Sequence, residues 1–346
     1  MCLAQLLRSQ VCSMVDACRS DLNLTCEPSC DFTYRCSTTP AIGVGQTVAG
    51  LCNATIGSGS TALKGPWGIY VSSFDGSLYV GDWDLNTFQV YSAFSRMGQI
   101  ILSGGVLQAL DIFADSSGTI YMADGTYNNG AVYIQRAGIN LTSFPAAGLS
   151  TSACLFTGIY TAYGIAVDSS GNIYISLHYC YMVVKWTPNA TNGTLIAGIP
   201  GVQGSTNNKL GRLRFIHLDE ARGALYISDF TNNRIQKFII GGNGTGVPAA
   251  GNSIAGTGLN QLNGPGGIWV TRDGQTLYVA DYGNNRVMKW TIGATQGSVV
   301  AGSANGVAGS TTQLMNQPAD VALDPSETYL YVSDYGNHRV QRFRVR

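Results

Sequence analysis

Charged side chains are scarce in this sequence. They make up 12% of its 346 residues, about half the share of an average soluble protein. Glu occurs only three times and Lys only five times, although both are common on the surfaces of helices. This shortage excludes a mainly helical protein. Basic and acidic residues are equal in number, and a net charge of zero argues against a strongly electrostatic partner such as nucleic acid.

Long apolar runs are also missing. No stretch approaches the ~18 apolar residues of a membrane-spanning helix, so we expect no membrane span. A hydrophobic fraction of 45% nevertheless argues against a disordered chain. The abundant residues are Gly, with 44 copies, and Tyr, with 18. Gly is typical of tight turns and Tyr of strands, and the composition therefore predicts an all-β protein.

Cysteines cluster at the N-terminus. Six of the nine fall within the first 36 residues, a segment too short to build its own hydrophobic core, so we predict a small disulfide-rich arm over residues 1–40. A zinc site is the weaker alternative, because no second Cys pair and no His accompany the CxxxC spacing. The six cysteines are Cys2, Cys12, Cys18, Cys26, Cys30 and Cys36.

Sequons for N-glycosylation are frequent. Six Asn-x-Ser/Thr triplets occur, and with the many cysteines they predict a secreted, extracellular glycoprotein that carries N-linked glycans. The sequons begin at Asn23, Asn53, Asn140, Asn189, Asn192 and Asn243.

One pattern repeats six times along the chain. Each copy has an apolar run, a short turn, then Tyr-Val-Ala-Asp or a close relative, a tight loop and a third run. Gly, Asp and Asn occupy the turns, as expected for β-hairpins. The repeat is marked by an aligned tyrosine at Tyr79, Tyr121, Tyr174, Tyr226, Tyr278 and Tyr331.

A fourth run with a small-residue ending follows each copy except the last. The missing run is found instead before the first copy, at residues 46–50. This displacement is what circular closure requires, because the N-terminal strand then becomes the outer strand of the last blade and no sheet edge stays open. We therefore predict a six-bladed β-propeller of four-stranded antiparallel blades over residues 41–346.

The segments resemble NHL repeats, whose motif ends in D-x-x-N-N-R-V. It is seen at Asp229–Ile235, at Asp281–Val287 and, with His338 in place of Asn, at Asp334–Val340. The resemblance implies a six-bladed propeller. Blades 4–6 keep the whole motif and blades 1–3 depart from it. The Asp and Arg flank a short hairpin loop, close enough to pair across it, and we interpret them as structural.

Three further cysteines lie in the propeller. Cys154 lies in the loop that enters blade 3, and Cys180 lies in a hairpin loop of the same blade. We expect both on one face of the propeller, where a disulfide between them is sterically feasible. Two unrelated buried thiols are the alternative. Cys52 lies on that face after the closing strand and could tether the arm. Seven cysteines then remain, and the odd one indicates an intermolecular bridge or a free thiol.

Catalysis and metal binding in propellers use the central channel. The NHL-like peptide amidating lyase places zinc-binding His residues at the starts of inner strands, and this chain has none there. Its His178, His217 and His338 stand at unmatched positions and cannot assemble that site. The corresponding residues are Trp67, Leu110, Tyr163, Arg214, Gly266 and Ala319.

Carboxylates offer two candidate calcium sites, which we interpret as structural. Asp111 and Asp320 occupy matching inner-strand starts but lack further ligands from other blades, so hydrogen bonding is favoured over calcium. The Asp82–Asn86 segment (DWDLN) lacks the later Gly and Glu of a calcium loop and is expected to cap a turn. No enzyme motif is present, and we expect no catalytic residues, metal or cofactor.

What remains is a neutral, glycosylated disc with a cysteine-rich arm. We expect a non-enzymatic extracellular scaffold that self-associates or binds another extracellular protein, as a subunit of a fibre or matrix assembled through its arm. A receptor-like propeller that binds a ligand on its glycan-free face is the alternative, and a divergent amidating lyase or lactonase is a third. The candidate anchors for a partner are the aromatic residues Trp83, Phe88, Tyr127 and Tyr179.

Overall fold

The computed structural model describes most of the propeller and part of the arm. The described residues are 24–28, 34–38, 43–51, 56, 62–93, 95, 97–103, 108–126, 131–135, 149–150 and 154–346. Among them, no helix is long and apolar enough to cross a membrane.

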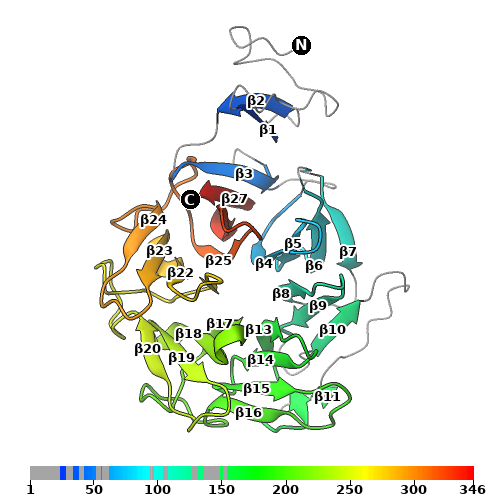
Figure 1. Cartoon of the computed structure of the whole chain (residues 1–346), viewed down its shortest axis with the longest axis vertical. Helices are drawn as coiled ribbons and strands as arrows, with labels where there is room; N and C mark the ends of the chain where they lie inside the picture. Colours follow the sequence, from blue (N-terminus) through cyan, green and yellow to red (C-terminus); the bar gives the residue numbers. More distant parts are fainter. Residues whose placement is uncertain are drawn as a thin grey trace.

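Six blades surround a central axis (Figure 1). In each, strands a to d run from the axis outward and pair antiparallel. Blade 1 contains β4 (Pro66–Val71), β5 (Leu78–Asp82), β6 (Thr87–Tyr91) and β7 (Gln99–Ser103). Blade 2 contains β8 (Ala109–Ala114), β9 (Ile120–Asp124) and β10 (Ala131–Gln135). Blade 3 contains β13 (Ala162–Val167), β14 (Ile173–Leu177), β15 (Met182–Trp186) and β16 (Thr194–Gly198).

The other three blades follow the same plan. Blade 4 contains β17 (Leu213–Asp219), β18 (Ala224–Asp229), β19 (Arg234–Ile239) and β20 (Val247–Ala250). Blade 5 contains β21 (Ile268–Val270), β22 (Thr276–Asp281), β23 (Arg286–Thr291) and β24 (Ser298–Gly302). Blade 6 contains β25 (Pro318–Leu323), β26 (Tyr329–Asp334) and β27 (Arg339–Arg344), completed by β3 (Gly45–Gly50).

The predicted closure of the ring is confirmed. Strand β3 pairs antiparallel with β27, with Ala49 opposite Val340, so the two ends of the propeller share one sheet. The fourth strand predicted for blade 2, at residues 143–148, lies outside the described residues. Two short strands, β11 (Leu149–Ser150) and β12 (Gly158–Ile159), pair in parallel between blades 2 and 3.

The core lies between the blades. Strands β5, β9 and β14 are buried along their whole length, because neighbouring blades cover both faces of each sheet. In one such layer, Tyr226 and Ile235 of blade 4 pack against Leu277 and Trp290 of blade 5. Burying a large apolar side chain contributes about 1.5–3 kcal/mol, so the stacked blades supply most of the stability.

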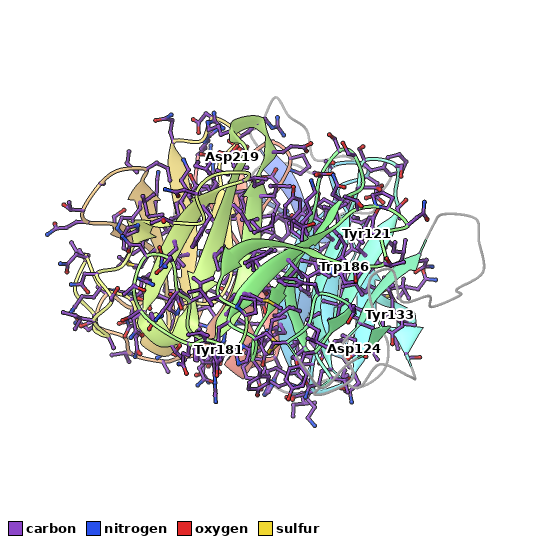
Figure 2. All side chains as sticks on the ribbon, turned by 90° about the horizontal axis from the view of Figure 1, so that it is seen from below. Tyr121, Asp124, Tyr133, Tyr181, Trp186 and Asp219 are labelled. Atoms are coloured by element: carbon purple, nitrogen blue, oxygen red, sulfur yellow. A yellow bond between two sulfur atoms is a disulfide. The ribbon has the colours of Figure 1, made fainter. Side chains whose placement is uncertain are left out.

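The two faces of the disc carry different loops. The a–b and c–d loops lie on one face, here called the ab face, and the b–c and d–a loops lie on the other, the bc face. Figure 2 views the disc from its side and places Asp219, where β17 ends, at the ab face. Asp124 and Tyr181, at b–c turns, lie at the bc face in the same view.

A disulfide joins Cys154 to Cys180 with a Cα–Cα distance of 5.3 Å, as predicted from their neighbouring loops. In the arm, β1 (Leu24–Pro28) and β2 (Tyr34–Thr38) form a hairpin whose backbone register sets Cys26 opposite Cys36. Cys2, Cys12, Cys18, Cys30 and Cys52 lie outside the described residues.

Candidate ligand site in the central channel

The inner strands present matched positions to the channel. Register shifts near the start of β4, β8, β13, β17 and β25 interrupt the simple alternation of side chains. Counting from Trp67 and its equivalents, the second position alternates between Gly and a larger residue around the ring. In blade order its residues are Gly68, Asp111, Gly164, Phe215, Gly267 and Asp320.

The alternation has a steric cause. A Cβ on Gly267 would lie 1.6 Å from Oδ1 of Asp320, and one on Gly68 would lie 2.3 Å from the carbonyl oxygen of Leu110. Each glycine therefore leaves room for its neighbour's backbone and side chain. Three larger side chains from alternate blades share the middle of the channel as a result.

Two of these side chains are carboxylates that hold neighbouring blades together. Asp111 accepts the N–H of Ile165 in blade 3 at 2.8 Å and that of Ile112 at 2.9 Å. Asp320 likewise accepts the N–H of Ile69 in blade 1 and that of Val321, both at 2.8 Å. The predicted hydrogen bonding at inner-strand starts is confirmed.

Both carboxyl groups resist ionisation. Burial raises the pKa of Asp111 to about 7, although the backbone N–H groups oppose the shift. Burial and the negative charge of Asp111 raise the pKa of Asp320 well above its ordinary value. The two groups therefore influence each other across the channel, and no cation in the described lining neutralises them.

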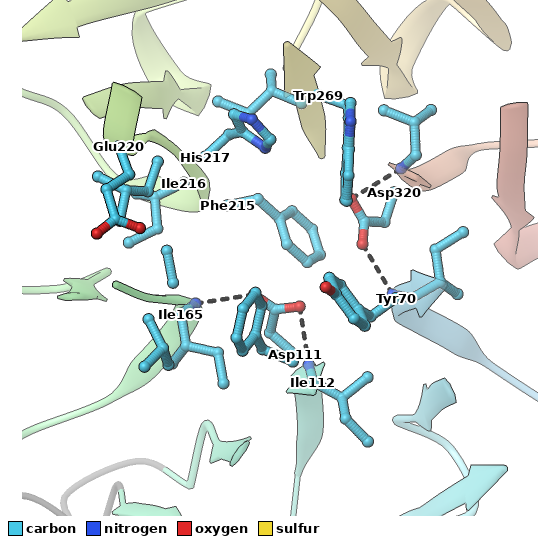
Figure 3. Close-up of a pocket in the computed structure, with 17 residues that line it drawn as sticks. Tyr70, Asp111, Ile112, Ile165, Phe215, Ile216, His217, Glu220, Trp269 and Asp320 are labelled. Atoms are coloured by element: carbon cyan, nitrogen blue, oxygen red, sulfur yellow. Dashed lines mark hydrogen bonds between the residues drawn. The ribbon is translucent and has the colours of Figure 1, made fainter. Parts of the chain in front are cut away.

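A chamber of about 240 Å³ opens beside this pair on the ab side of the channel. Phe215 is almost completely buried and lies between the two carboxylates (Figure 3). The fourth inner-strand position supplies rings from four blades, and Glu220 of the short helix η3 (Glu220–Arg222) also lines the chamber. These four rings are Tyr70, Phe113, His217 and Trp269.

The rings form a continuous arc. The ring centroids of Phe113 and Tyr70 lie 4.7 Å apart, those of Tyr70 and Trp269 lie 6.1 Å apart, and those of Trp269 and His217 lie 4.9 Å apart. Burial lowers the pKa of His217 to about 4, so its imidazole is neutral at pH 7. A second hollow of about 230 Å³ shares three of the rings and extends to Arg272, Asp324 and Glu327 at the surface.

Comparison with known proteins agrees with the fold. The family model described as NHL repeat matches residues 315–343, which include the last D-x-x-N-x-R-V motif. The chain is an NHL-repeat β-propeller.

Solved structures share the architecture of this NHL propeller at low sequence identity. A structural genomics protein of unknown function from Bacteroides thetaiotaomicron is 18% identical, with a TM-score of 0.70 over 91% of this chain and 78% of that one. An auxiliary nutrient binding protein from the same organism is 14% identical, with a TM-score of 0.64 over 89% and 77%. Virginiamycin B lyase from Staphylococcus aureus is 14% identical, with a TM-score of 0.52 over 87% and 88%. These likenesses establish the fold alone.

The aromatic anchors proposed from the sequence do not line the chamber of the NHL propeller. Phe88 is completely buried in the layer between blades 1 and 2, so its prediction as an exposed anchor is wrong. Trp83 is half-buried at the bc end of the channel, where its ring packs edge-on against Trp67 at 4.6 Å. Tyr179 is half-buried beside His178, and Tyr127 lies outside the described residues.

Three predicted glycosylation sites are exposed in the NHL propeller. Asn189 and Asn192 lie between β15 and β16, and Asn243 lies between β19 and β20. All three are on c–d loops at the outer part of the ab face, which leaves space for glycans. Asn23, Asn53 and Asn140 lie outside the described residues.

The carboxylates weighed as calcium ligands act as backbone caps. Asp82 accepts N–H groups from Lys64, Gly65 and Leu85 at 2.8, 2.9 and 3.1 Å, which confirms its predicted capping role. Within the described part of the chain, no three His, Cys, Asp or Glu side chains are close enough to hold a metal ion.

The sequence reasoning missed the chamber. In the sequence, His217 has no matched His in another blade, and no motif marks Tyr70, Phe113 or Trp269. All four stand two residues after the second inner-strand position, so alternation along a strand places them on the same side as Asp111 and Asp320. This two-residue spacing from Asp111 and its equivalents is the sequence signal that places the four rings in the channel.

Proposed function

We propose that the protein is a non-enzymatic, extracellular binding protein that takes a small organic cation in the channel chamber. The observation that carries this proposal is the lining, which combines three carboxyl groups with an arc of rings and, among the described residues, contains neither Lys nor Arg. An auxiliary nutrient binding protein among the solved structures of the same fold supports a binding role.

The charge of the lining favours a cation. Asp111 and Asp320 have raised pKa values because they are buried without a counter-charge, and an ammonium group would supply that charge. Each carboxylate offers about four lone-pair sites, and the two backbone N–H groups at each leave acceptor capacity for a ligand. The faces of Tyr70 and Trp269 would attract the same cation.

The volume favours a small ligand. A chamber of about 240 Å³ is below the usual range of about 300–1,000 Å³ for drug-sized ligands. A simple amine or quaternary ammonium compound fits it better than a peptide does.

We propose a non-enzymatic role because of the residue types in the chamber and the hydrogen bonds that its aspartates make. The chamber lining contains no Ser, Thr, Cys or Lys nucleophile among the described residues, and both aspartates hold the backbone of neighbouring blades. The extracellular part rests on the six sequons and the Cys154–Cys180 disulfide.

A scaffold or fibre role through the arm remains a separate proposal that is compatible with ligand binding. Deleting residues 1–40 tests it, because oligomers seen by size-exclusion chromatography should disappear while the propeller stays folded. Oligomers that persist would contradict assembly through the arm.

The chamber proposal is tested by calorimetric titration with ethanolamine, with choline and with the uncharged isostere of choline in which carbon replaces nitrogen. We expect both cations to bind and the isostere not to bind. Trp269→Ala should weaken binding about tenfold, since it removes a cation–π face. Phe74→Ala is the matched control, because Phe74 is 69% exposed in an a–b loop of the same face.

Two results would overturn the proposal. Equal binding of choline and its isostere would show that charge is not recognised. Absence of heat and of any thermal shift with all of these compounds would contradict a cation-binding function for the chamber.

A further inference from the structure

The bc end of the channel holds a second cluster, on the other side of Phe215 from the chamber. Arg214 of β17 stands there among three aromatic rings. Its guanidinium carbon lies 3.9 Å from the ring centroid of Phe230, 4.3 Å from that of Tyr282 and 4.9 Å from that of Trp67. Arg214 is only 8% exposed.

Two donor atoms of this cluster are unused, although the Arg214 guanidinium also interacts with the hydroxyl of Tyr282. Within the described part of the chain, Nη1 of Arg214 and Nε1 of Trp67 are buried and have no hydrogen-bond acceptor. No carboxylate forms an ion pair with Arg214 among the described residues. Burial accordingly lowers the pKa of the Arg214 guanidinium.

The other buried arginines are satisfied. Arg286 is completely buried, yet its Nε donates to Asp281 at 2.8 Å, and its other nitrogens donate to loop carbonyls. Arg234 and Arg339 bind aspartates in the same way at 2.9 Å. A buried charge without such partners is costly, and aromatic faces compensate only part of that cost.

We propose that Arg214 anchors an anion site that takes the carboxylate of a small organic acid. The planar guanidinium fork matches a carboxylate, and the indole N–H of Trp67 is available as a further donor. The rings of Trp83, Tyr282 and Tyr335 are only partly buried, so they form a border against which the apolar body of an aromatic acid can pack.

The surrounding charges agree with an anion. Arg212 is exposed and lies over the Tyr179 ring at 5.3 Å, which adds positive charge on this face. His178 stacks on Tyr163 at 4.2 Å, and burial lowers its pKa to about 4, so it is neutral at pH 7. The acidic side chains that act on Tyr335 at this border are those of Asp84, which lies near Gly65, and Asp82.

The site is separate from the chamber. Phe215 stacks on Trp67 with centroids 6.4 Å apart and an interplanar angle of 28°, and these rings pack with Leu110 and Tyr163 across the channel. A carboxylate bound at Arg214 should therefore not compete with a cation bound in the chamber, and either site can exist without the other.

The test is a titration of the full chain with sodium benzoate, acetate and sulfate at constant ionic strength in chloride, followed by tryptophan fluorescence and thermal denaturation. Benzoate should bind saturably, change the fluorescence of Trp67 and raise the melting temperature. Acetate should bind more weakly because it has no ring, and sulfate should not compete with benzoate. Choline should leave the benzoate affinity unchanged.

Two arginine variants distinguish a binding role from a structural one. Arg214→Met should weaken benzoate binding at least about tenfold, the ratio expected for one charge-assisted hydrogen bond. It should leave the melting temperature of the unliganded protein unchanged or higher, since an unpaired buried charge is removed. Arg286→Met, the matched control, should lower the melting temperature without benzoate, because it breaks a satisfied pair.

Three outcomes would overturn the proposal. A wild-type protein that does not respond to benzoate or acetate, or that responds only to sulfate, would exclude a carboxylate site. An Arg214→Met variant that binds benzoate as tightly as the wild type would exclude Arg214 as the anchor. An Arg214→Met variant whose melting temperature without ligand falls as far as that of Arg286→Met would show that Arg214 has a structural role instead. Arg214→Lys, which keeps the charge without the fork, should retain the fold and bind benzoate weakly.

Discussion

Blades 4–6 and blades 1–3 fasten their b–c turns by different means. In blades 4–6, one Asp, one Asn and one Arg form a set that we call the clamp, in which the Asp and the Arg are buried. In blade 5 it consists of Asp281, Asn284 and Arg286, and the Asp–Arg pair is completely buried. The same three residue types recur in blades 4 and 6 at the same spacing. Blades 1–3 lack the arginine.

The clamp ties each hairpin to the loops that cross between blades. Arg286 donates to the carbonyls of Thr257, Gly258 and Gln261 before its blade and to that of Ala304 after it. These carbonyls lie at the blade edge and need donors, because loop backbone that is buried without partners is unfavourable. One side chain therefore satisfies several loops at once.

Blades 1 and 2 keep the Asp of the clamp, as Asp82 and Asp124, but have no Arg opposite it. Asp82 still caps its hairpin, but Thr87 stands in the Arg position. Blade 3 has Leu177 at the Asp position, paired with Met182 at the Arg position, and the Cys154–Cys180 disulfide links the incoming loop to the turn. The comparison indicates that the loop that enters each blade must be fixed to the b–c turn, whereas the kind of interaction that fixes it can differ.

Breaking a clamp should have the largest effect. Asp281→Ala leaves Arg286 buried without its carboxylate and should lower the free energy of unfolding by about 3–5 kcal/mol, measured by urea denaturation. Asp82→Ala is the counterpart in blade 1 and should cost less, about 1–3 kcal/mol, because only hydrogen bonds to the backbone are lost.

A double variant sharpens the same contrast. Combining Asp281→Leu with Arg286→Met removes both charges and should recover much of the loss seen in either single variant. Equal losses for Asp281→Ala and Asp82→Ala would mean that the arginine adds nothing to the clamp.

Removing the disulfide should have the next largest effect. Cys154→Ser with Cys180→Ser opens a loop of sequence separation 26 and should lower the free energy of unfolding by about 2–4 kcal/mol. Adding a reductant to the wild-type protein should produce a similar loss, and it should produce none in the double variant. Unchanged stability under reducing conditions would show that blade 3 does not depend on this tie.

The pH dependence of Asp111 should be weaker but has a definite sign. Its pKa in the folded protein, about 7, lies above the ordinary value of 3.8, so the folded state holds the proton more tightly. Its contribution to stability is complete below pH ~4 and is lost as the pH rises toward 7. The stability of the wild type relative to Asp111→Asn should therefore fall across this range.

Measuring that difference isolates Asp111 together with its effect on the pKa of Asp320. Burial lowers the pKa values of His178 and His217 to about 4. Their contribution to the stability of the protein is therefore lost as the pH falls, opposite to that of Asp111, and this loss is the same in both proteins. Their effects cancel when the two urea-denaturation profiles are subtracted. A difference that stays constant between pH 4 and 7 would contradict the raised pKa of Asp111.

The repeat register predicted most of the fold because it is a local property of the sequence. Six aligned tyrosines and a displaced fourth run predicted the blades and their closure, and loop positions alone predicted the Cys154–Cys180 bond. The prediction that Phe88 is exposed is wrong for a physical reason. Neighbouring blades cover both faces of β6, so alternation does not reveal which side of that strand is exposed.

The chamber and the Arg214 cluster were harder to predict because they depend on which side chains meet across the axis. The register places His217 in the channel, but only the structure brings it beside Trp269 and sets Phe215 between Asp111 and Asp320. In the sequence, Arg214 is only an inner-strand position without His. That no acceptor reaches its Nη1 depends on the three-dimensional arrangement of the blades.

The smallest expected effect concerns the residue that follows the Asn of the clamp. This position has a left-handed backbone conformation and contacts the next blade: Asn233 accepts the N–H of Gly264 and Asn285 accepts that of Gln317. In blade 6, Nδ1 of His338 contacts the carbonyl oxygen of Lys64 instead. His338→Ala should lower the free energy of unfolding by about 1 kcal/mol, through the lost hydrogen bond and the unfavourable backbone angle. His338→Asn tolerates that angle and offers an N–H donor, so it should stay within about 0.5 kcal/mol of the wild type. A large loss for Asn would show that the imidazole, rather than the conformation, is what links the last blade to the first.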